Sequence, residues 1–305
     1  MALGRTLLIV NPAARHGETR KLMPAVERLL DGVTEYAVEV SAGPRHAQDL
    51  ARTVSGFDAI VAVGGDGTAH EVINGIMGQD PEFRPAFGIV PTGSGNDYAH
   101  TLGMSDDLST ALRQITGARK KPVDLGLCND TWFGESVSVG LDARVTAKAV
   151  ELKISTGLTG IALYLRALLY VLRHQYYSHR LTIQYDDEEP FETDALIVAA
   201  TNGPTYGGGF LITPDSVNDD GLLDTCRIDM LHKTEAYARL PFVVLGRHTN
   251  MRPVHMKRAK RLTVVADEPI EGQVDGEVIL ASAYDIQVVP AALTALVPAE
   301  KDARR

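Results

Sequence analysis

The sequence predicts an α/β protein with a parallel sheet in its first part and a β-rich, sandwich-like domain in its second. Over the first 125 residues, short apolar runs alternate with stretches of helical periodicity, which is typical of parallel strands joined by right-handed crossovers. From about residue 126 onward, strand-like segments follow one another with few helices between them. We therefore expect one domain over residues 1–125 and a second over 126–289, with the C-terminal segment, about 290–305, as a candidate to return to the first.

The first domain is predicted to contain four strands buried on both faces, each followed by turn residues. Helices are predicted between these strands at 19–30, 46–54 and 68–77. Because the carboxyl ends of parallel strands line the ligand crevice of such sheets, the four turns are expected to converge in space. The predicted strands are Leu7–Val10, Ala37–Val40, Ala59–Val63 and Phe87–Val90, and the turns read NPAARHG, SAGPRH, GGDGT and PTGSGND.

The second domain is predicted to be mainly β-structure with three helical interruptions. These helices are expected near 142–152, near 158–173 and over 233–247. The predicted strands lie at 179–187, 195–203, 222–230, 261–267 and 285–289.

Composition restricts the function and the compartment. The formal net charge of −9 over 305 residues argues against a nucleic-acid partner, which usually requires a basic face. Two cysteines without CxxC spacing indicate reduced thiols in a cytoplasmic protein. The apolar stretch 157–172 carries Arg166 and falls short of the roughly 20 apolar residues of a membrane span.

The stretch GGDGT, residues 64–68, places glycines and an aspartate between a predicted strand and a predicted helix. A glycine turn at a helix N-terminus presents backbone N–H groups to an anion and lets a polyphosphate approach closely. An aspartate in such a cradle calls for a cation, so Asp66 indicates Mg²⁺. A tight turn with Asp66 as a helix cap is the alternative, and neither the Walker nor the dinucleotide glycine pattern is present.

The stretch PTGSGND, residues 91–97, repeats this arrangement after the next strand. Asn96 and Asp97 would start a helix there, and Asn-Asp is also a favourable pair for capping alone. Adjacent strand ends would bring Asp66 and Asp97 close together, and neighbouring carboxylates need a cation to offset their repulsion.

In combination, these motifs resemble the diacylglycerol kinase catalytic-domain family, which includes bacterial soluble lipid kinases, sphingosine kinases and ceramide kinases. The resemblance extends over nearly the whole chain. Besides GGDGT and PTGSGND it rests on NPAAR at 11–15, SAGPRHAQDLA at 41–51, KPVDLG at 121–126, TPDSVNDDGLLD at 213–224 and GQVDGE at 272–277.

The resemblance implies a nucleotide-binding half like that of NAD kinase and phosphofructokinase, with ATP in its crevice. Asp97 and Asp124 would organise a Mg²⁺–water network around the phosphates together with Asp66. Asp275 or Glu277 would be the general base, and Asp275 is favoured. The nucleotide contacts implied are Asn11, Pro12, Ser41, Gly64, Gly65, Asp66, Gly67, Thr68, Thr92 and Asn96.

The acidic loop at 213–224 is implied to hold a second, structural Mg²⁺. Its ligands would be the Asp220 carboxylate and the carbonyls of Val217 and Leu222, and oxygen donors of this kind suit Mg²⁺. The sequence QVDGE also predicts a hairpin, because Asp-Gly between apolar residues is the strongest short hairpin signal.

Two segments are candidates for contact with a lipid. The predicted helix around 158–172 carries Ile161, Leu165, Leu169 and other apolar residues on one side. Such a stripe more often packs into a protein core than contacts a lipid. The basic run RPVHMKRAKR, 252–261, would suit either anionic headgroups or water. The expected partners are a lipid at a membrane surface, touched peripherally, and a second copy in a homodimer.

The function predicted is an ATP-dependent lipid kinase that phosphorylates a hydroxyl of a lipid such as diacylglycerol. The alternatives are an NAD kinase-like enzyme, which shares GGDGT but should lack PTGSGND and the late DGE, and a non-catalytic nucleotide sensor, against which Asp275 and Glu277 argue. The lipid itself stays open, because apolar pockets discriminate chain shape poorly.

Overall fold

The computed structural model describes residues 3–14, 24, 26 and 34–299. The chain divides into two compact units, Met1–Val123 with Ala291–Arg305, and Asp124–Pro290. The helix predicted at 19–30 lies almost wholly outside the described residues.

The first unit is built on parallel strands. β1 (Thr6–Val10) pairs in parallel with β2 (Tyr36–Val40) and β3 (Ala59–Gly64), and β3 pairs with β4 (Ala86–Pro91). The end of β13 (Glu277–Val297) adds a parallel contact to β4 through Ala295 and Phe87. Among its described residues, four helices follow or connect the strands of this unit: α2 (His46–Thr53), α3 (Asp66–Met77), α4 (Asp97–Thr101) and α5 (Leu108–Thr116), with a 3₁₀ turn η2 (Pro81–Phe83).

Burial in this sheet follows strand position. β1, β3 and β4 are buried along their whole length, as their β-branched and leucine-rich sequences predict. β2 was expected to be buried on both faces, but none of its five residues is buried. The reason is its place at the edge of the sheet, where, within the described part of the chain, β1 alone pairs with it.

The second unit is an antiparallel, β-rich domain. Its strands follow the order β11-β10-β9-β7-β12-β13, with β8 paired to β12 and β9. A core that includes Phe133, Tyr284 and Leu262 lies against this sheet. The strands are β6 (Thr131–Phe133), β7 (Ser136–Gly140), β8 (His179–Tyr185), β9 (Phe191–Thr201), β10 (Leu223–Asp229), β11 (Val254–Ala259) and β12 (Arg261–Val274), and β5 (Arg119–Cys128) leads in from the first unit.

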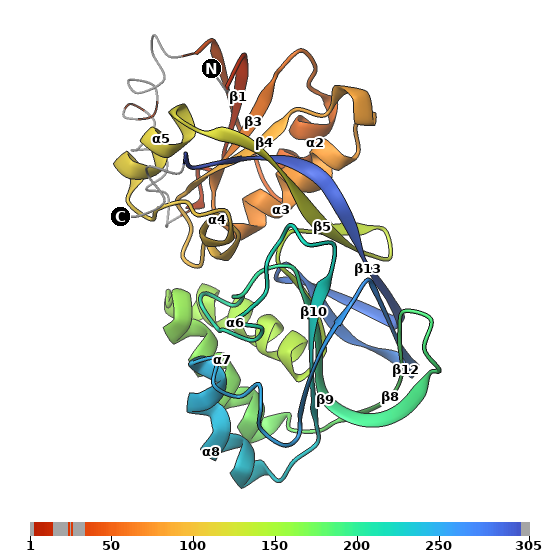
Figure 1. Ribbon diagram of the computed structural model, residues 1–305. Helices are drawn as coiled ribbons and strands as arrows, with labels where there is room; N and C mark the ends of the chain where they lie inside the picture. Colours follow the sequence, from red (N-terminus) through yellow and green to blue (C-terminus); the bar gives the residue numbers. More distant parts are fainter. Residues whose placement is uncertain (1–2, 15–23, 25, 27–33, 300–305) are drawn as a thin grey trace. The chain divides into compact units, whose positions relative to one another are not determined.

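Three helices gather on one side of the second unit: α6 (Leu141–Thr156), α7 (Gly160–His174) and α8 (Lys233–Val244) (Figure 1). A separate apolar cluster centred on Leu163, Ala167 and Val171 holds them together. Over the part of the chain that the structure describes, no single helix is long and apolar enough to cross a membrane. α6 and α7 pass that test of length and composition only as a pair, bent by 117°.

Two sequence interpretations change in this unit. The basic run 252–261 contains the strand β11, which lies at the end of the sheet order, and lysine and arginine on an edge strand discourage pairing with other chains. On α7, Ile161, Leu165 and Leu169 of the predicted apolar stripe are exposed, whereas Leu163, Ala167 and Val171 on the other side of the helix are buried. In addition, no strands were predicted in the β5–β6–β7 region, of which the sequence analysis used only KPVDLG, because its apolar runs are short and interrupted.

Candidate functional site

The loop between β3 and α3 carries the glycine-rich stretch GGDGT into the N-terminus of a helix. Gly64 ends the strand and Gly65 precedes the first residue of the helix, Asp66. The Thr68 and Ala69 N–H groups both donate to the Gly65 carbonyl at 3.0 Å, and the N–H groups before them belong to the start of the helix, which offers them no acceptor of its own. A Cβ added at Gly67 would meet no atom within 4 Å. This space at a helix N-terminus suits a phosphate group.

The Asp66 carboxylate braces the neighbouring loop. Its Oδ2 accepts the backbone N–H of Asn96 at 2.8 Å and its Oδ1 accepts that of Tyr98 at 3.2 Å. Tyr98 lies in the first turn of α4 and Asn96 directly precedes this helix. N–H groups at this end of a helix need an external acceptor. Asp66 therefore acts as a helix cap, although for α4 rather than for its own helix.

The two glycine-rich loops touch backbone to backbone. A Cβ at Gly93 would lie 2.5 Å from the Gly65 Cα, and the Thr92 N–H donates to the Gly64 carbonyl at 2.8 Å. Asn96, in the left-handed conformation, accepts the Gly93 N–H at 2.9 Å. Side chains larger than hydrogen do not fit this contact.

The remaining nucleotide candidates lie at the carboxyl ends of the same strands. The side-chain amide of Asn11, the residue directly before Pro12, donates to the Thr68 hydroxyl at 3.0 Å. The Ser41 N–H donates to the carbonyl of Val10 at 2.9 Å. The structure thus brings together all the first-unit candidates: Asn11, Pro12, Ser41, Gly64, Gly65, Asp66, Gly67, Thr68, Thr92, Asn96 and the buried Asp97.

In the second unit, Asp275 forms the tip of the hairpin between β12 and β13. Asp275 and Gly276 both adopt positive φ, 46° and 88°, as an Asp-Gly hairpin turn requires. The Asp275 carboxylate accepts three backbone N–H groups: from Gly134 at 2.8 Å, Glu135 at 3.0 Å and Ser136 at 2.9 Å. Its oxygens are therefore held by the backbone that leads into β7.

Glu277, two residues later, has a different environment. It is exposed at the start of β13. Among the residues that the structure describes, none hydrogen-bonds or ion-pairs with its carboxylate. Glu277 is therefore available to a ligand, whereas Asp275 is engaged in fixing the hairpin.

Asn202 links the segments that carry the second-unit carboxylates. Its fully buried amide donates to the carbonyls of Asp124, at 2.9 Å, and of Gly134, at 3.0 Å. The Asn202 N–H donates to the carbonyl of Glu135, which is also buried. Asp124 is tied in turn to the acidic loop, because its carboxylate accepts the Gly221 N–H at 2.7 Å.

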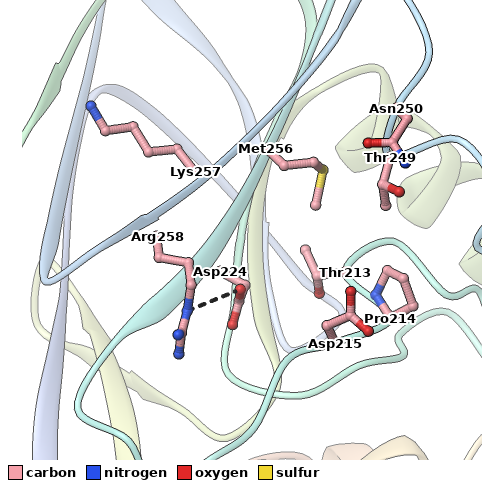
Figure 2. Close-up of a pocket in the computed structure, with 9 residues that line it drawn as sticks. All are labelled: Thr213, Pro214, Asp215, Asp224, Thr249, Asn250, Met256, Lys257 and Arg258. Atoms are coloured by element: carbon pink, nitrogen blue, oxygen red, sulfur yellow. Dashed lines mark ion pairs between the residues drawn. The ribbon is translucent and has the colours of Figure 1, made fainter.

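The acidic loop does not present its carboxylate to a free cation site. The Asp220 carboxylate forms an ion pair with Arg258 of β11 and accepts the Leu222 N–H at 3.1 Å. The Arg258 Nε also lies 3.4 Å from the Asp224 carboxylate, beside a cavity of about 440 Å³ (Figure 2). A guanidinium on the one carboxylate of the set does not fit a divalent cation on Val217, Asp220 and Leu222. The described residues also contain no cluster of three histidine, cysteine or acidic side chains placed to hold a metal.

A polar network lies beneath the Asp275 hairpin. Gln273 accepts the Gly276 N–H at 2.7 Å and donates to the Ser138 hydroxyl at 3.0 Å, and Ser138 donates to Asp142 at 2.5 Å. Burial raises the pKa of Asp142 to about 6, although hydrogen bonds from Ser138, Tyr206 and Gln273 oppose the rise.

The sequence analysis missed Asn202, Glu135, Asp142 and Arg258. Asn202 follows a strand and precedes a glycine, a signal like that of the first two loops, but the segment 195–203 was interpreted only as a strand. Glu135, Asp142 and Arg258 belong to no glycine-rich motif, and the partners of Arg258, Asp220 and Asp224, are distant in sequence.

A parallel α/β unit with a glycine-rich helix N-terminus, followed by an antiparallel β-rich unit, defines a two-domain kinase of the NAD kinase and diacylglycerol kinase fold. The diacylglycerol kinase catalytic domain matches residues 5–128, and the YegS C-terminal NAD kinase beta sandwich-like domain matches residues 135–297. The chain belongs to the diacylglycerol kinase catalytic-domain family of lipid kinases. The resemblance predicted from the motifs is confirmed.

Relatives of this chain support the same family. A diacylglycerol kinase from Mycobacterium tuberculosis is 29% identical over 97% of this chain and 96% of its own length. Solved structures show the fold. A diacylglycerol kinase from Bacillus anthracis str. Sterne superposes with a TM-score of 0.77 over 99% of both chains at 22% identity. An Archaeoglobus fulgidus NAD kinase in complex with ATP gives 0.52 over 98% of this chain and 96% of its own, at 14% identity.

Proposed function

We propose that this protein transfers the γ-phosphate of ATP to a hydroxyl group of a membrane lipid such as diacylglycerol. The family supports a lipid kinase, and one relative bears the name diacylglycerol kinase. The open space over Gly67 at the N-terminus of α3 fits a triphosphate, because N–H groups and the helix dipole favour anions there.

The general base in this proposal is Glu277. The observation that carries it is the contrast within the hairpin: three backbone N–H groups hold the Asp275 carboxylate, whereas Glu277 is exposed and has no hydrogen bond or ion pair to any residue the structure describes. A base must be able to take the proton of the acceptor hydroxyl as the phosphoryl group arrives, and such a base contributes about 10²–10⁴ in rate. Asp275 is then a positioning residue.

The nucleotide would enter with Mg²⁺, which when bound neutralises charge on the phosphates. In this proposal the α3 N-terminus binds the phosphates, Asp66 keeps the two glycine-rich loops together, and the Asp275 hairpin orients Glu277. Phosphoryl transfer needs positioning and charge stabilisation more than covalent chemistry. The α3 N-terminus supplies charge stabilisation, and Asp66 and the Asp275 hairpin supply positioning.

The test is a transfer assay with ATP labelled on its γ-phosphate and mixed micelles of detergent and diacylglycerol. We expect label in a phosphorylated lipid from the parent protein and a loss of about 10²–10⁴ in rate from Glu277→Gln. A parallel assay replaces the micelles with NAD. A third assay supplies a total lipid extract as the acceptor. Transfer of label to NAD, and to no lipid of the extract, would assign the NAD kinase reaction instead. Transfer to neither NAD nor lipid would indicate a non-catalytic nucleotide sensor.

A further inference from the structure

The helical side of the second unit exposes large apolar side chains that contribute little to any core. On α7, Ile161, Leu165 and Leu169 recur at every fourth position and are each about 40% exposed. On α6, Ile154 is 85% exposed. We call these residues, with Val150 of α6 and Tyr237, Phe242 and Leu245 at α8, the helical apolar face.

This face is not a surface left over from incomplete packing. The other side of α7 already packs through Leu163, Ala167 and Val171 into the helical cluster. α8 has no buried residue at all, so it covers α7 only lightly, although the two helices lie side by side (Figure 1). Several large apolar side chains exposed on neighbouring helices are typical of an interaction site.

The charge around the face is opposite to that of the whole chain. The segment 141–174 contains five lysines and arginines against two acidic residues, and 233–247 contains three against one, whereas the chain carries a net charge of −9. Arg144 is buried and Lys148 and Arg239 have acidic partners within these segments, so the free charge comes from the other basic residues. Arg166 and Arg173 are exposed on α7 itself. A helix with an apolar stripe bordered by arginine is typical of segments that lie in a membrane interface.

The other basic segment offers less free charge. On β11, Lys257 is paired with Glu188 at 2.5 Å and Arg258 with Asp220. These pairs neutralise the strand locally, and its apolar residues are not exposed as a group.

We propose that the helical apolar face docks on the surface of an anionic phospholipid bilayer, with Ile154, Leu165 and Leu169 inserted among the headgroups. The inference rests on the proposed lipid kinase function, because docking on a bilayer brings such an enzyme to a substrate that resides there. A second copy of the chain would be a poorer occupant, since it would bring the same basic residues against each other.

The test is binding to sedimented vesicles of equal parts phosphatidylglycerol and phosphatidylcholine, compared with phosphatidylcholine alone. We expect stronger binding to the anionic vesicles, weakened by salt. Leu165→Gln/Leu169→Gln should lower the affinity by about tenfold or more, and Arg166→Gln/Arg173→Gln by about fivefold for each charge. The matched controls are Leu280→Gln, an exposed leucine on β13, and Lys120→Gln/Lys260→Gln, and both should bind like the parent.

A second readout separates this inference from the proposed function. Phosphorylation of a short-chain diacylglycerol dissolved as monomers should be unchanged in the Leu165→Gln/Leu169→Gln variant, with activity lost only on vesicles. Vesicle binding needs no catalysis, so it stands if the kinase assay fails. Equal binding by parent and face variants would overturn the inference, as would variants that change a dimer to a monomer in size-exclusion chromatography and bind vesicles normally.

Discussion

Asp275 and Ser136 are joined by two hydrogen bonds of opposite direction, each 2.9 Å long: the Asp275 carboxylate accepts the Ser136 N–H, and the Asp275 N–H donates to the Ser136 carbonyl. With Gly134 and Glu135 also donating to the same carboxylate, the hairpin tip is fixed to the strand beside it. Glu277 receives its position from this arrangement.

The first prediction separates the two hairpin carboxylates by stability. Asp275→Asn places an amide N–H₂ against backbone donors, so it should lower the free energy of unfolding by about 1–3 kcal/mol as well as reduce activity. Glu277→Gln should leave unfolding in urea unchanged while kcat falls and KM for ATP holds. A destabilised Glu277→Gln, or an Asp275→Asn variant as stable as the parent, would contradict this division of roles.

The second prediction tests the phosphate cradle with paired glycine substitutions. Gly67→Ala adds a Cβ where no atom lies within 4 Å, so the fold should keep its Tm, while ATP affinity measured by calorimetry falls by about tenfold or more. Gly93→Ala adds a Cβ 2.5 Å from the Gly65 Cα, so it should destabilise the protein by about 1–3 kcal/mol. Normal ATP binding by Gly67→Ala would show that the space over this residue is not part of the nucleotide site.

Local chemistry accounts for what could be predicted from the sequence. The GGDGT and PTGSGND loops, and the hairpin at Asp275 and Gly276, depend on residues within a few positions of each other. β-branched runs likewise define β1, β3 and β4. These features need no knowledge of distant partners.

The rest depends on contacts between residues far apart in the chain. The Asp275 carboxylate is held by donors at 134–136, and Asp220 by Arg258, so no spacing rule reveals either. The exposed part of α7 was a candidate for lipid contact as well as for core, because leucine repeats at helical spacing do not reveal which leucines receive a partner. The role of Asp66 was open between a cation and a cap, and in the structure its oxygens accept N–H groups from a different helix, α4.

The third prediction concerns pH. Burial raises the pKa of Asp142 to about 6, above the value of about 3.9 in an unfolded chain. The folded state therefore binds the proton more tightly, so this contribution to stability is fully present below pH of about 4 and is lost as the pH rises through 6. Asp142→Asn does not titrate and should be more stable than the parent by about 1–3 kcal/mol at pH 7, with little difference at pH 4. The check is urea unfolding of both proteins from pH 4 to 8, and a difference independent of pH would refute the assignment.

The fourth prediction concerns the acidic loop. Because Arg258 neutralises Asp220 and approaches Asp224 at 3.4 Å, MgCl₂ should change the Tm of the parent, measured without nucleotide, by less than about 1 °C. Arg258→Gln leaves two carboxylates without their cation, so the same salt should raise the Tm of this variant by at least about 2 °C. Lys257→Gln on the same strand, which breaks only the pair with Glu188, should show no such gain. Equal stabilisation of parent and Arg258→Gln would mean that a divalent cation binds the loop despite the guanidinium.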